Sequence, residues 1–486
     1  MNIADFSAPP PSPQPLQDPI HTQTATLLKD ANLHASRVIT WHLAQPVRDT
    51  LLIETGDRAD VVHVSKRADG QVAICVNGRL YTFPVSAQKD GPPPLLHIKT
   101  QGGNDSVKID SDVRLDVKIE AGDGHDDVQA GGGATWLYGG SGHDTLHLAD
   151  GTGYAEGNEG DDLIIGGTGS HVMYGNDGND RLYAGPGTSG KQSYLDGGRG
   201  DDRLYAGKGH TVINGGRGND VMVGHDRTTF YTGLGRDTVF ANGGRQHVFG
   251  KPGDRFYGAH LSTVVLRTPS RAGAQGLHLV GSAAFRQRVA DDLDMLRSSP
   301  NGQAMLREMD AAAARNGAPV TIREETAVDD SQYVFGSEEL TARQRLGPVD
   351  QDDPINGVIR NGRPGSRATQ ASIAYNRSSL HLTPGDVAPP ITSLYHELAH
   401  AYNGANGTFL PGITQEGGQG DAPTFVANDE RQAVGLPTDA QPFDFDNDPA
   451  TPATTTNPMP FNENALNAEM GRPLRTRYSG TRGNDK

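Results

Sequence analysis

The segment Gly198-Arg-Gly-Asp-Asp202-Arg-Leu204 is one copy of a short pattern that recurs between about residues 100 and 255. Further copies are Gly140-Ser-Gly-His-Asp144-Thr-Leu, Asn176-Asp-Gly-Asn-Asp180-Arg-Leu and Gly216-Arg-Gly-Asn-Asp220-Val-Met. The aspartates recur every 18 residues, apart from a four-residue insertion near Gly187-Thr-Ser-Gly190. Repetition at a fixed short period predicts a solenoid, in which each coil packs only against its neighbours.

The repeated pattern resembles the RTX nonapeptide GGxGxDxUx, which builds a calcium-binding parallel β-roll. Glycine permits the tight turn, the aspartate and turn carbonyls bind calcium, and the apolar residue U points into the core. The resemblance implies calcium ligands at Asp126, Asp144, Asp162, Asp180, Asp202 and Asp220. The intervening half-coils keep glycine but lack the aspartate, so we expect calcium along one edge only. The alternative is a plain glycine-rich solenoid whose aspartates form turn hydrogen bonds.

Upstream of the repeats, segments such as Asp60-Val-Val-His-Val-Ser alternate as strands, and residues 71–83 are predicted to form a hairpin around Asn77-Gly78. We expect residues 49–100 to cap the solenoid, whose end would otherwise expose an open edge. Residues 1–48 begin with a Pro-, Ser- and Gln-rich stretch and are expected to be disordered. They do not form a Sec signal peptide, but a polar N-terminus of this kind is compatible with type III secretion.

The composition restricts the class of protein. With 63 glycines in 486 residues and 35% hydrophobic residues, the chain is too glycine-rich for one ordinary globular core. The net charge of −16 argues against nucleic acid or an anionic membrane as the main partner and favours cation binding. The single cysteine, Cys75, excludes intrachain disulfides and a zinc site built on several cysteines. No run of 18 apolar residues is present, so we expect no transmembrane helix.

Beyond the repeats, His396-Glu-Leu-Ala-His400 has the HExxH pattern of zinc-peptidase helices. Two histidines four residues apart lie on one face of a helix and can hold one metal ion. Glu397 projects beside the metal, where it can take a proton from a bound water as general base. Pro389-Pro390 before the motif and Gly404 after it predict a helix of about three turns. The alternative is an amphipathic helix with two surface histidines.

A catalytic zinc needs a third protein ligand and an open position. The metzincin pattern is excluded because Asn403 and Asn406 stand where its glycine and third histidine would be. The remaining common arrangement takes a glutamate from a later helix, and Glu430 is the best candidate because the segment around it can be helical. The rival ligands are Asp429, Asp421 and Glu416.

Further downstream, Arg475 and Tyr478 lie three residues apart and are candidates for stabilising the oxyanion of a tetrahedral intermediate. The alternative is a basic tail. The elements expected between the repeats and this pair are helices at 283–297 and 302–315, strands at 319–323 and 371–375, the zinc helix, and a long loop between 437 and 460. This order predicts a multidomain chain, with an all-β parallel β-roll at 101–265 followed by an α+β zincin-like metallopeptidase domain at 270–486.

Five motifs of this region stand in a fixed order: His396-Glu-Leu-Ala-His400-Ala-Tyr-Asn, Gly407-Thr, Glu430-Arg-Gln-Ala-Val-Gly-Leu436, Asn462-Glu-Asn464 and Pro473-Leu-Arg-Thr-Arg-Tyr478. Their combination is similar to metallopeptidase family 91, a family of bacterial effector zinc peptidases, over roughly residues 280 to 480. The resemblance implies zinc, a glutamate general base, delivery into host cells by type III secretion, and endopeptidase action on host signalling proteins.

These observations predict a secreted bacterial zinc endopeptidase whose partners are a host protein substrate and the secretion machinery, and whose β-roll binds calcium for folding, delivery or targeting. The alternative is a calcium-binding adhesion or structural protein with an inactive peptidase-like domain. A third interpretation is a metal-dependent enzyme that acts on a non-peptide bond. Zinc content and dependence of activity on Glu397 separate the first two.

Overall fold

The structure is a computed structural model that describes residues 20–42, 45–85, 94–243, 245–258, 264–383, 386–417, 424–446 and 448–478. The chain divides into two compact units, one formed mainly by residues before 264 and the other mainly by residues from 264 onward. Among the described residues, no helix has the length and apolar character needed to cross a bilayer.

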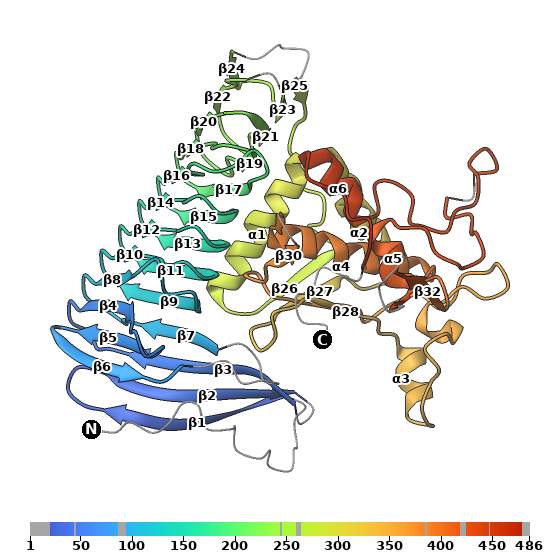
Figure 1. Ribbon diagram of the computed structural model, residues 1–486. Coiled ribbons are helices and arrows are strands. Elements are labelled where there is room, and N and C mark those ends of the chain that lie inside the picture. The colour runs from blue at the N-terminus through green and yellow to red at the C-terminus, as the bar shows by residue number, and fades with distance from the viewer. Residues whose placement is uncertain are drawn as a thin grey trace. The chain divides into compact units, whose positions relative to one another are not determined.

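The first unit contains a parallel β-solenoid of two sheets, whose strands alternate along the chain (Figure 1). One sheet has the order β1 (Ile20–Lys29), β2 (His34–His42), β3 (Gln45–Glu54), β7 (Pro94–Lys99), β9 (Asp116–Asp123), β11 (Thr135–Ser141), β13 (Gly153–Glu159), β15 (His171–Asp177), β17 (Gln192–Arg199), β19 (His210–Asn214), β21 (Arg227–Tyr231), β23 (Arg245–Gly250) and β25 (Val264–Leu266). The other has the order β24 (Arg255–Tyr257), β22 (Thr238–Phe240), β20 (Val221–Val223), β18 (Arg203–Tyr205), β16 (Arg181–Tyr183), β14 (Leu163–Ile165), β12 (Thr145–His147), β10 (Asp127–Gln129), β8 (Ser106–Ile109), β4 (Val61–Lys66), β5 (Val72–Val76) and β6 (Arg79–Phe83).

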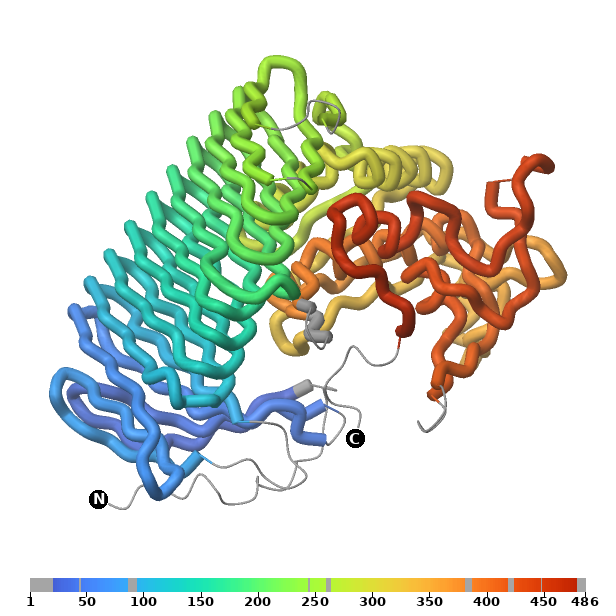
Figure 2. The backbone as a smooth tube through the Cα atoms, turned by 45° about the horizontal axis from the view of Figure 1, so that its top comes forward, coloured from blue at the N-terminus to red at the C-terminus, as the bar shows by residue number. Residues whose placement is uncertain are grey.

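The period of the sequence sets the core of the roll. β12 pairs in parallel with β10 and β14, and its middle residue Leu146 stands in register with Val128 and Ile164. All three side chains are fully buried, and each contributes about 1.5–3 kcal/mol by leaving water. Every coil thus adds one apolar residue from this sheet to a continuous core, and Figure 2 shows the coils of this unit stacked one on the next. The parallel β-roll predicted from the repeats is confirmed.

Glycine is required in the turns because successive coils approach backbone to backbone. Gly142 has a φ of 131°, and a Cβ at this position would lie 1.6 Å from the carbonyl oxygen of Gly124, one coil earlier. Gly160 stands in the same relation to Gly142. A side chain at either position would push two coils apart.

Antiparallel strands precede the roll in both sheets. β5 and β6 form the hairpin predicted around Asn77-Gly78, and both turn residues have positive φ, 51° and 79°. Residues 20–42 and 45–48, which we expected to be disordered, instead form β1, β2 and the start of β3. The reason is apolar alternation that we underweighted, since Ala35, Ile39 and Trp41 are buried. Residues 1–19, the main part of the expected secretion signal, lie outside the described residues.

The second unit contains a small sheet surrounded by helices. The sheet has the order β26 (Leu277–Val280), β27 (Val320–Glu324), β29 (Ser372–Tyr375), β28 (Gln332–Val334); the first three strands are parallel and β28 is an antiparallel edge strand. The helices are α1 (Ala283–Ser298), α2 (Pro300–Asn316), α3 (Glu338–Gln344), α4 (Pro390–Asn406), α5 (Asn428–Val434), α6 (Glu463–Met470) and the short 3₁₀ helix η2 (Pro354–Asn356). Two hairpins complete the unit, β30 (His381–Thr383) with β31 (Asp386–Ala388) and β32 (Ile413–Glu416) with β33 (Thr424–Ala427).

Local signals explain where the helices begin and end. α1 and α2 match the helices predicted at 283–297 and 302–315, and they begin at Ser282 and Ser299, whose side chains accept backbone N–H groups. α4 begins with Pro390 at its first turn and ends at Gly407, which has a φ of 70°. The predicted stop at Gly404 was wrong. Gly404 lies inside the helix, and glycine is needed there because a Cβ would lie 2.0 Å from the Tyr333 hydroxyl.

Candidate active site

Helix α4 brings His396 and His400 together on one buried face. The two side chains are one helical turn apart, and both residues are at most 7% exposed. Their Nε2 atoms lie 3.1 Å apart. Every residue of α4 from Pro390 to Ala405 is buried, so this is a core helix that carries two ligand-type side chains rather than a surface helix with two histidines.

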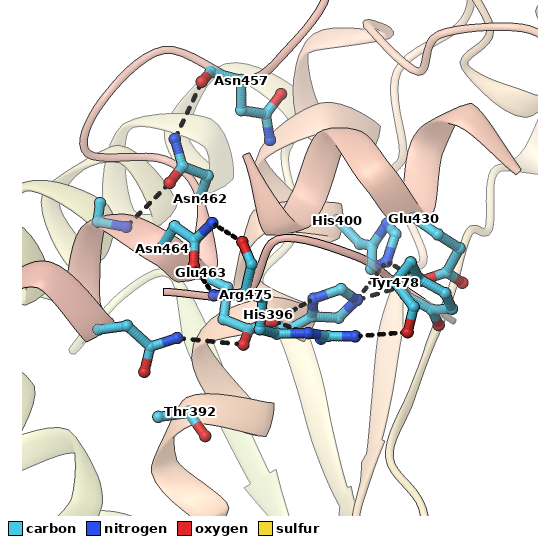
Figure 3. Close-up of polar contacts among 12 residues, drawn as sticks. Thr392, His396, His400, Glu430, Asn457, Asn462, Glu463, Asn464, Arg475 and Tyr478 are labelled. Atoms are coloured by element: carbon cyan, nitrogen blue, oxygen red, sulfur yellow. Dashed lines mark hydrogen bonds and ion pairs between the residues drawn. The ribbon is translucent and has the colours of Figure 1, made fainter. Parts of the chain in front are cut away.

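Helix α5 brings Glu430 to the same point. Its Oε2 atom lies 3.2 Å from the Nε2 atoms of both His396 and His400 (Figure 3). Bonds of about 2.0–2.1 Å to a tetrahedral zinc would put ligand atoms roughly 3.3 Å apart, so the three atoms are spaced as three corners of such a site. Within the described ranges these residues form the one His/Cys/Asp/Glu group with metal-site spacing.

The electrostatics of the three residues favour a positive charge where the ligand atoms meet. Burial lowers the pKa of His396, but hydrogen bonds with Glu430 and Glu463 outweigh it and raise this pKa to about 10. Burial raises the pKa of Glu430, but the charges of His400 and His396 lower it well below its usual value. A proton or a cation is therefore stabilised between these side chains.

Neither of the two rival ligands that the structure describes, Glu416 and Asp429, belongs to the cluster. The side chain of Glu416 accepts the backbone N–H of Tyr478, with distances of 2.8 and 3.0 Å to its two oxygens, and also pairs with Arg431. Asp429 accepts the backbone N–H of Glu430 and is not part of the cluster. Asp421 lies outside the described residues.

Glu397 lies beside the cluster without joining it. It is 6% exposed, and burial raises its pKa to about 7 although the charges of both histidines oppose the shift. The backbone N–H of Tyr333, on the edge strand β28, also opposes this rise in pKa. Since Tyr333 also stacks on His400, with ring centroids 6.3 Å apart, the edge strand and the histidine helix fix one another.

Glu463 and Arg475 hold His396 in its orientation. We predicted no role for Glu463, which contacts His396 directly. Glu463, at the start of α6, accepts from His396 Nδ1 at 3.1 Å, which leaves Nε2 free to face Glu430. Glu463 is 4% exposed and binds Nη1 of Arg475 at 2.8 Å. Burial raises the pKa of Glu463, but Arg475 and His396 lower it to about 2. Glu463 lies in the Asn462-Glu-Asn464 motif, but this motif does not reveal its partner, because 67 residues separate Glu463 from His396.

Arg475 and Tyr478 lie at the same site, in the C-terminal segment. Nη1 of Arg475 is held by Glu463 and Nη2 donates to the Tyr478 carbonyl oxygen at 3.1 Å (Figure 3). Asn464 holds the backbone of Arg475 through two hydrogen bonds of 2.9 Å. The Tyr478 ring lies 6.2 Å from the His396 ring. Arg475 is therefore a partner of Glu463, whereas Tyr478 lies beside a histidine of the cluster.

The repeat aspartates form a separate ladder in the first unit. The backbone N–H of each donates to Oδ1 of the aspartate one coil later, for example Asp126 to Asp144 at 2.8 Å and Asp144 to Asp162 at 2.7 Å. The ladder continues through Asp180, Asp202 and Asp220. It also includes four aspartates that we did not predict, at Asp60, Asp105, Asp237 and Asp254. Their separations from the neighbouring aspartate are 45, 21 and 17 residues. We did not predict them because these separations differ from the 18-residue period.

In six of these carboxylates the second oxygen lacks a partner within the described structure. Oδ2 is buried and has no hydrogen bond within the described structure at Asp105, Asp126, Asp144, Asp162, Asp180 and Asp202. Burial raises the pKa of Asp144 to about 6, of Asp180 to about 7 and of Asp162 to about 8. A Cβ at Gly157 would lie 2.1 Å from Asp162 Oδ2, so glycine is needed to admit this oxygen. A row of buried, unpartnered carboxylate oxygens fits a hard cation such as calcium.

Comparisons with known protein families give a match in each of the two regions described above. Residues 274–478 match peptidase family M91, described as effector protein. Residues 120–154, 156–189 and 194–226 match the RTX calcium-binding nonapeptide repeat. Comparison with curated proteins and with solved structures gives no match. The chain therefore combines a region that matches the M91 peptidase family of effector proteins, residues 274–478, with a preceding region that matches RTX calcium-binding repeats.

Proposed function

We propose that this protein is a secreted bacterial zinc endopeptidase that cleaves a host protein. The observation that carries the proposal is the convergence of His396, His400 and Glu430, with ligand atoms 3.1–3.2 Å apart and Glu397 beside them. These donors fit zinc, which takes imidazole nitrogen and carboxylate oxygen in tetrahedral sites. Zinc, when bound, supplies Lewis-acid chemistry and lowers the pKa of water at its open position to about 7.

The residues of the chain then divide the work. Glu397 takes the proton from the attacking water and passes it to the leaving amine, as a buried carboxylate with a raised pKa is suited to do. Tyr478 stabilises the oxyanion, and this assignment is supported by the position of its ring beside His396. Arg475 is a positioning residue, because its guanidinium contacts Glu463 and the Tyr478 carbonyl.

The fold we propose for this unit is zincin-like. Its support is the antiparallel edge strand β28, which contacts the histidine helix α4 and carries Tyr333, stacked on His400. β28 pairs with β29 on one side, so its other edge can accept an extended peptide by strand addition. The roll would serve folding, delivery or targeting, and type III translocation remains our proposal for the route.

Zinc stoichiometry and zinc-dependent cleavage test this function on the full chain. We expect one zinc per chain by mass spectrometry of metals, and cleavage of a peptide library that stops with 1,10-phenanthroline and returns with added zinc. His400→Phe removes one of three ligands and is expected to lose the zinc. A chain that holds no zinc at saturating metal would overturn the proposal and leave the repeats as the seat of function.

Glu463 provides a finer test, because it acts through His396. We expect Glu463→Gln to weaken zinc binding about 10- to 100-fold, the range found when such supporting carboxylates are changed. The amide keeps the shape but loses the charge that holds His396 Nδ1–H and Arg475. Competition with a fluorescent chelator measures the affinity directly. The matched control is Glu308→Gln, at a glutamate that pairs with Arg315, and equal affinities in the two variants would contradict the role.

A further inference from the structure

Lys191 is a buried cation on the edge of the roll that lacks the repeat aspartates. It is 3% exposed and lies in the turn between β16 and β17, next to the four-residue insertion. Its Nζ donates to the carbonyl oxygens of Ala184 at 2.5 Å, Gly167 at 2.6 Å and Pro186 at 2.8 Å. These carbonyls come from two successive turns, so the ammonium joins one coil to the next.

The surroundings of this ammonium are those of a bound metal ion rather than of an ion pair. Burial alone accounts for the pKa of Lys191, which falls to about 8, and among the described residues it has no carboxylate within ion-pair distance. Three converging backbone carbonyls are the ligands that hard cations take from turns. In the neighbouring coil an uncharged side chain takes the equivalent carbonyl: Nε2 of buried His171 lies 3.1 Å from the carbonyl oxygen of Ala149, 18 residues before Gly167, and burial lowers the pKa of His171 to about 3.

We propose that the turns at 166–169 and 184–187 form a cation site on this second edge, and that the Lys191 ammonium occupies it in place of a metal ion. The edge with the aspartates depends on calcium from solution, whereas the cation of this edge is part of a side chain. The insertion is what supplies it, because it lengthens the Asp180–Asp202 coil to 22 residues and gives the lysine room to fold back.

Chemical rescue of Lys191→Ala tests the site. The variant lacks Cγ, Cδ, Cε and Nζ, which n-propylammonium replaces atom for atom. With calcium saturating and ionic strength fixed, we expect the melting temperature of the roll in the full chain to fall by about 5 °C or more, because three buried carbonyls lose their donor. Addition of n-propylammonium should restore most of that loss, and tetramethylammonium, which has no N–H, should not.

Two further variants keep the test decisive. Lys208→Ala removes an exposed lysine of the next turn, paired with Asp226 at 3.0 Å, and is expected to melt as the wild type does and ignore propylammonium. Lys191→Met keeps a side chain of similar length without the charge. Its melting temperature should be lowered, and n-propylammonium should not restore it because the methionine methyl group fills the site. Wild-type stability of Lys191→Met, or an equal response of all variants to both ammonium ions, would overturn the proposal.

Discussion

Replacing Glu397 by glutamine is expected to lower peptide cleavage about 10³-fold or more while the zinc content stays at one per chain. Glutamine keeps the shape of the side chain, but it cannot take a proton. Because Glu397 is not a member of the ligand cluster, the metal should remain. Initial rates on the best peptide of a library, with metal analysis of the same samples, measure both quantities.

The matched control for Glu397→Gln is Glu339→Gln, at an exposed glutamate of α3 that accepts from Ser366. It should retain wild-type cleavage and metal. Loss of zinc in Glu397→Gln would make this residue a ligand, and retention of more than about a tenth of the activity would remove it from the role of general base.

Withdrawal of calcium at pH 8 is expected to lower the melting temperature of the roll by about 20 °C or more. A ligand at 100 times its Kd stabilises the folded state by about 2.7 kcal/mol per site, so several sites together amount to roughly 10 kcal/mol. Each kcal/mol is worth about 2–4 °C in a domain of this size. Circular dichroism of the full chain, melted in calcium and in chelator, gives the shift.

Acidification should partly replace calcium. The pKa values of Asp144, Asp180 and Asp162 are raised by burial to about 6, 7 and 8, above about 3.9 in the unfolded chain. The folded state therefore binds more protons, and without calcium the free energy of unfolding rises as pH falls from 8 towards 4. With saturating calcium this trend should vanish, since calcium and protons compete for the same oxygens.

Two variants at adjacent positions distinguish calcium binding by the aspartates from the hydrogen bonds that the aspartates form with one another. Asp162→Asn removes the charge but keeps an oxygen that can accept from Asp144 N–H, so it should weaken the calcium response. Asp161→Asn is the control, because Asn179 stands at the equivalent position of the next coil and accepts in the same way. Equal calcium titrations for both variants would favour a plain solenoid with hydrogen-bonding aspartates.

Those parts of the structure that depend on short-range spacing could be predicted from the sequence. The period of 18 leads to the coils, and the pair His396 and His400 needs only the geometry of one helix. Glu430 could be proposed because its segment can be helical and carries a carboxylate, although 30 residues separate it from His400. In each case the residues that support the prediction lie within one short segment of the sequence.

The rest depends on long-range packing that leaves no local pattern. Glu463 reaches His396 only because α6 and α4 pack together, and the Asn462-Glu-Asn464 motif by itself does not say which residue Glu463 contacts. Gly404 resembles a helix stop in the sequence, but it is glycine because Tyr333, about 70 residues earlier in the chain, packs against it. The strands at 20–48 follow a Pro-rich start whose composition masked their alternation.

The Asp ladder has a consequence for how the roll can change in length. Each coil satisfies the amide of the coil before it and offers its own amide to the coil after it. Loss of residues 145–162 would join Asp144 to Leu163, which already stands in register with Thr145, and Asp144 would then meet Asp180. The roll can therefore change in length by whole coils. In-frame duplication or loss of the 18 residues of one coil lengthens or shortens it without any further substitution.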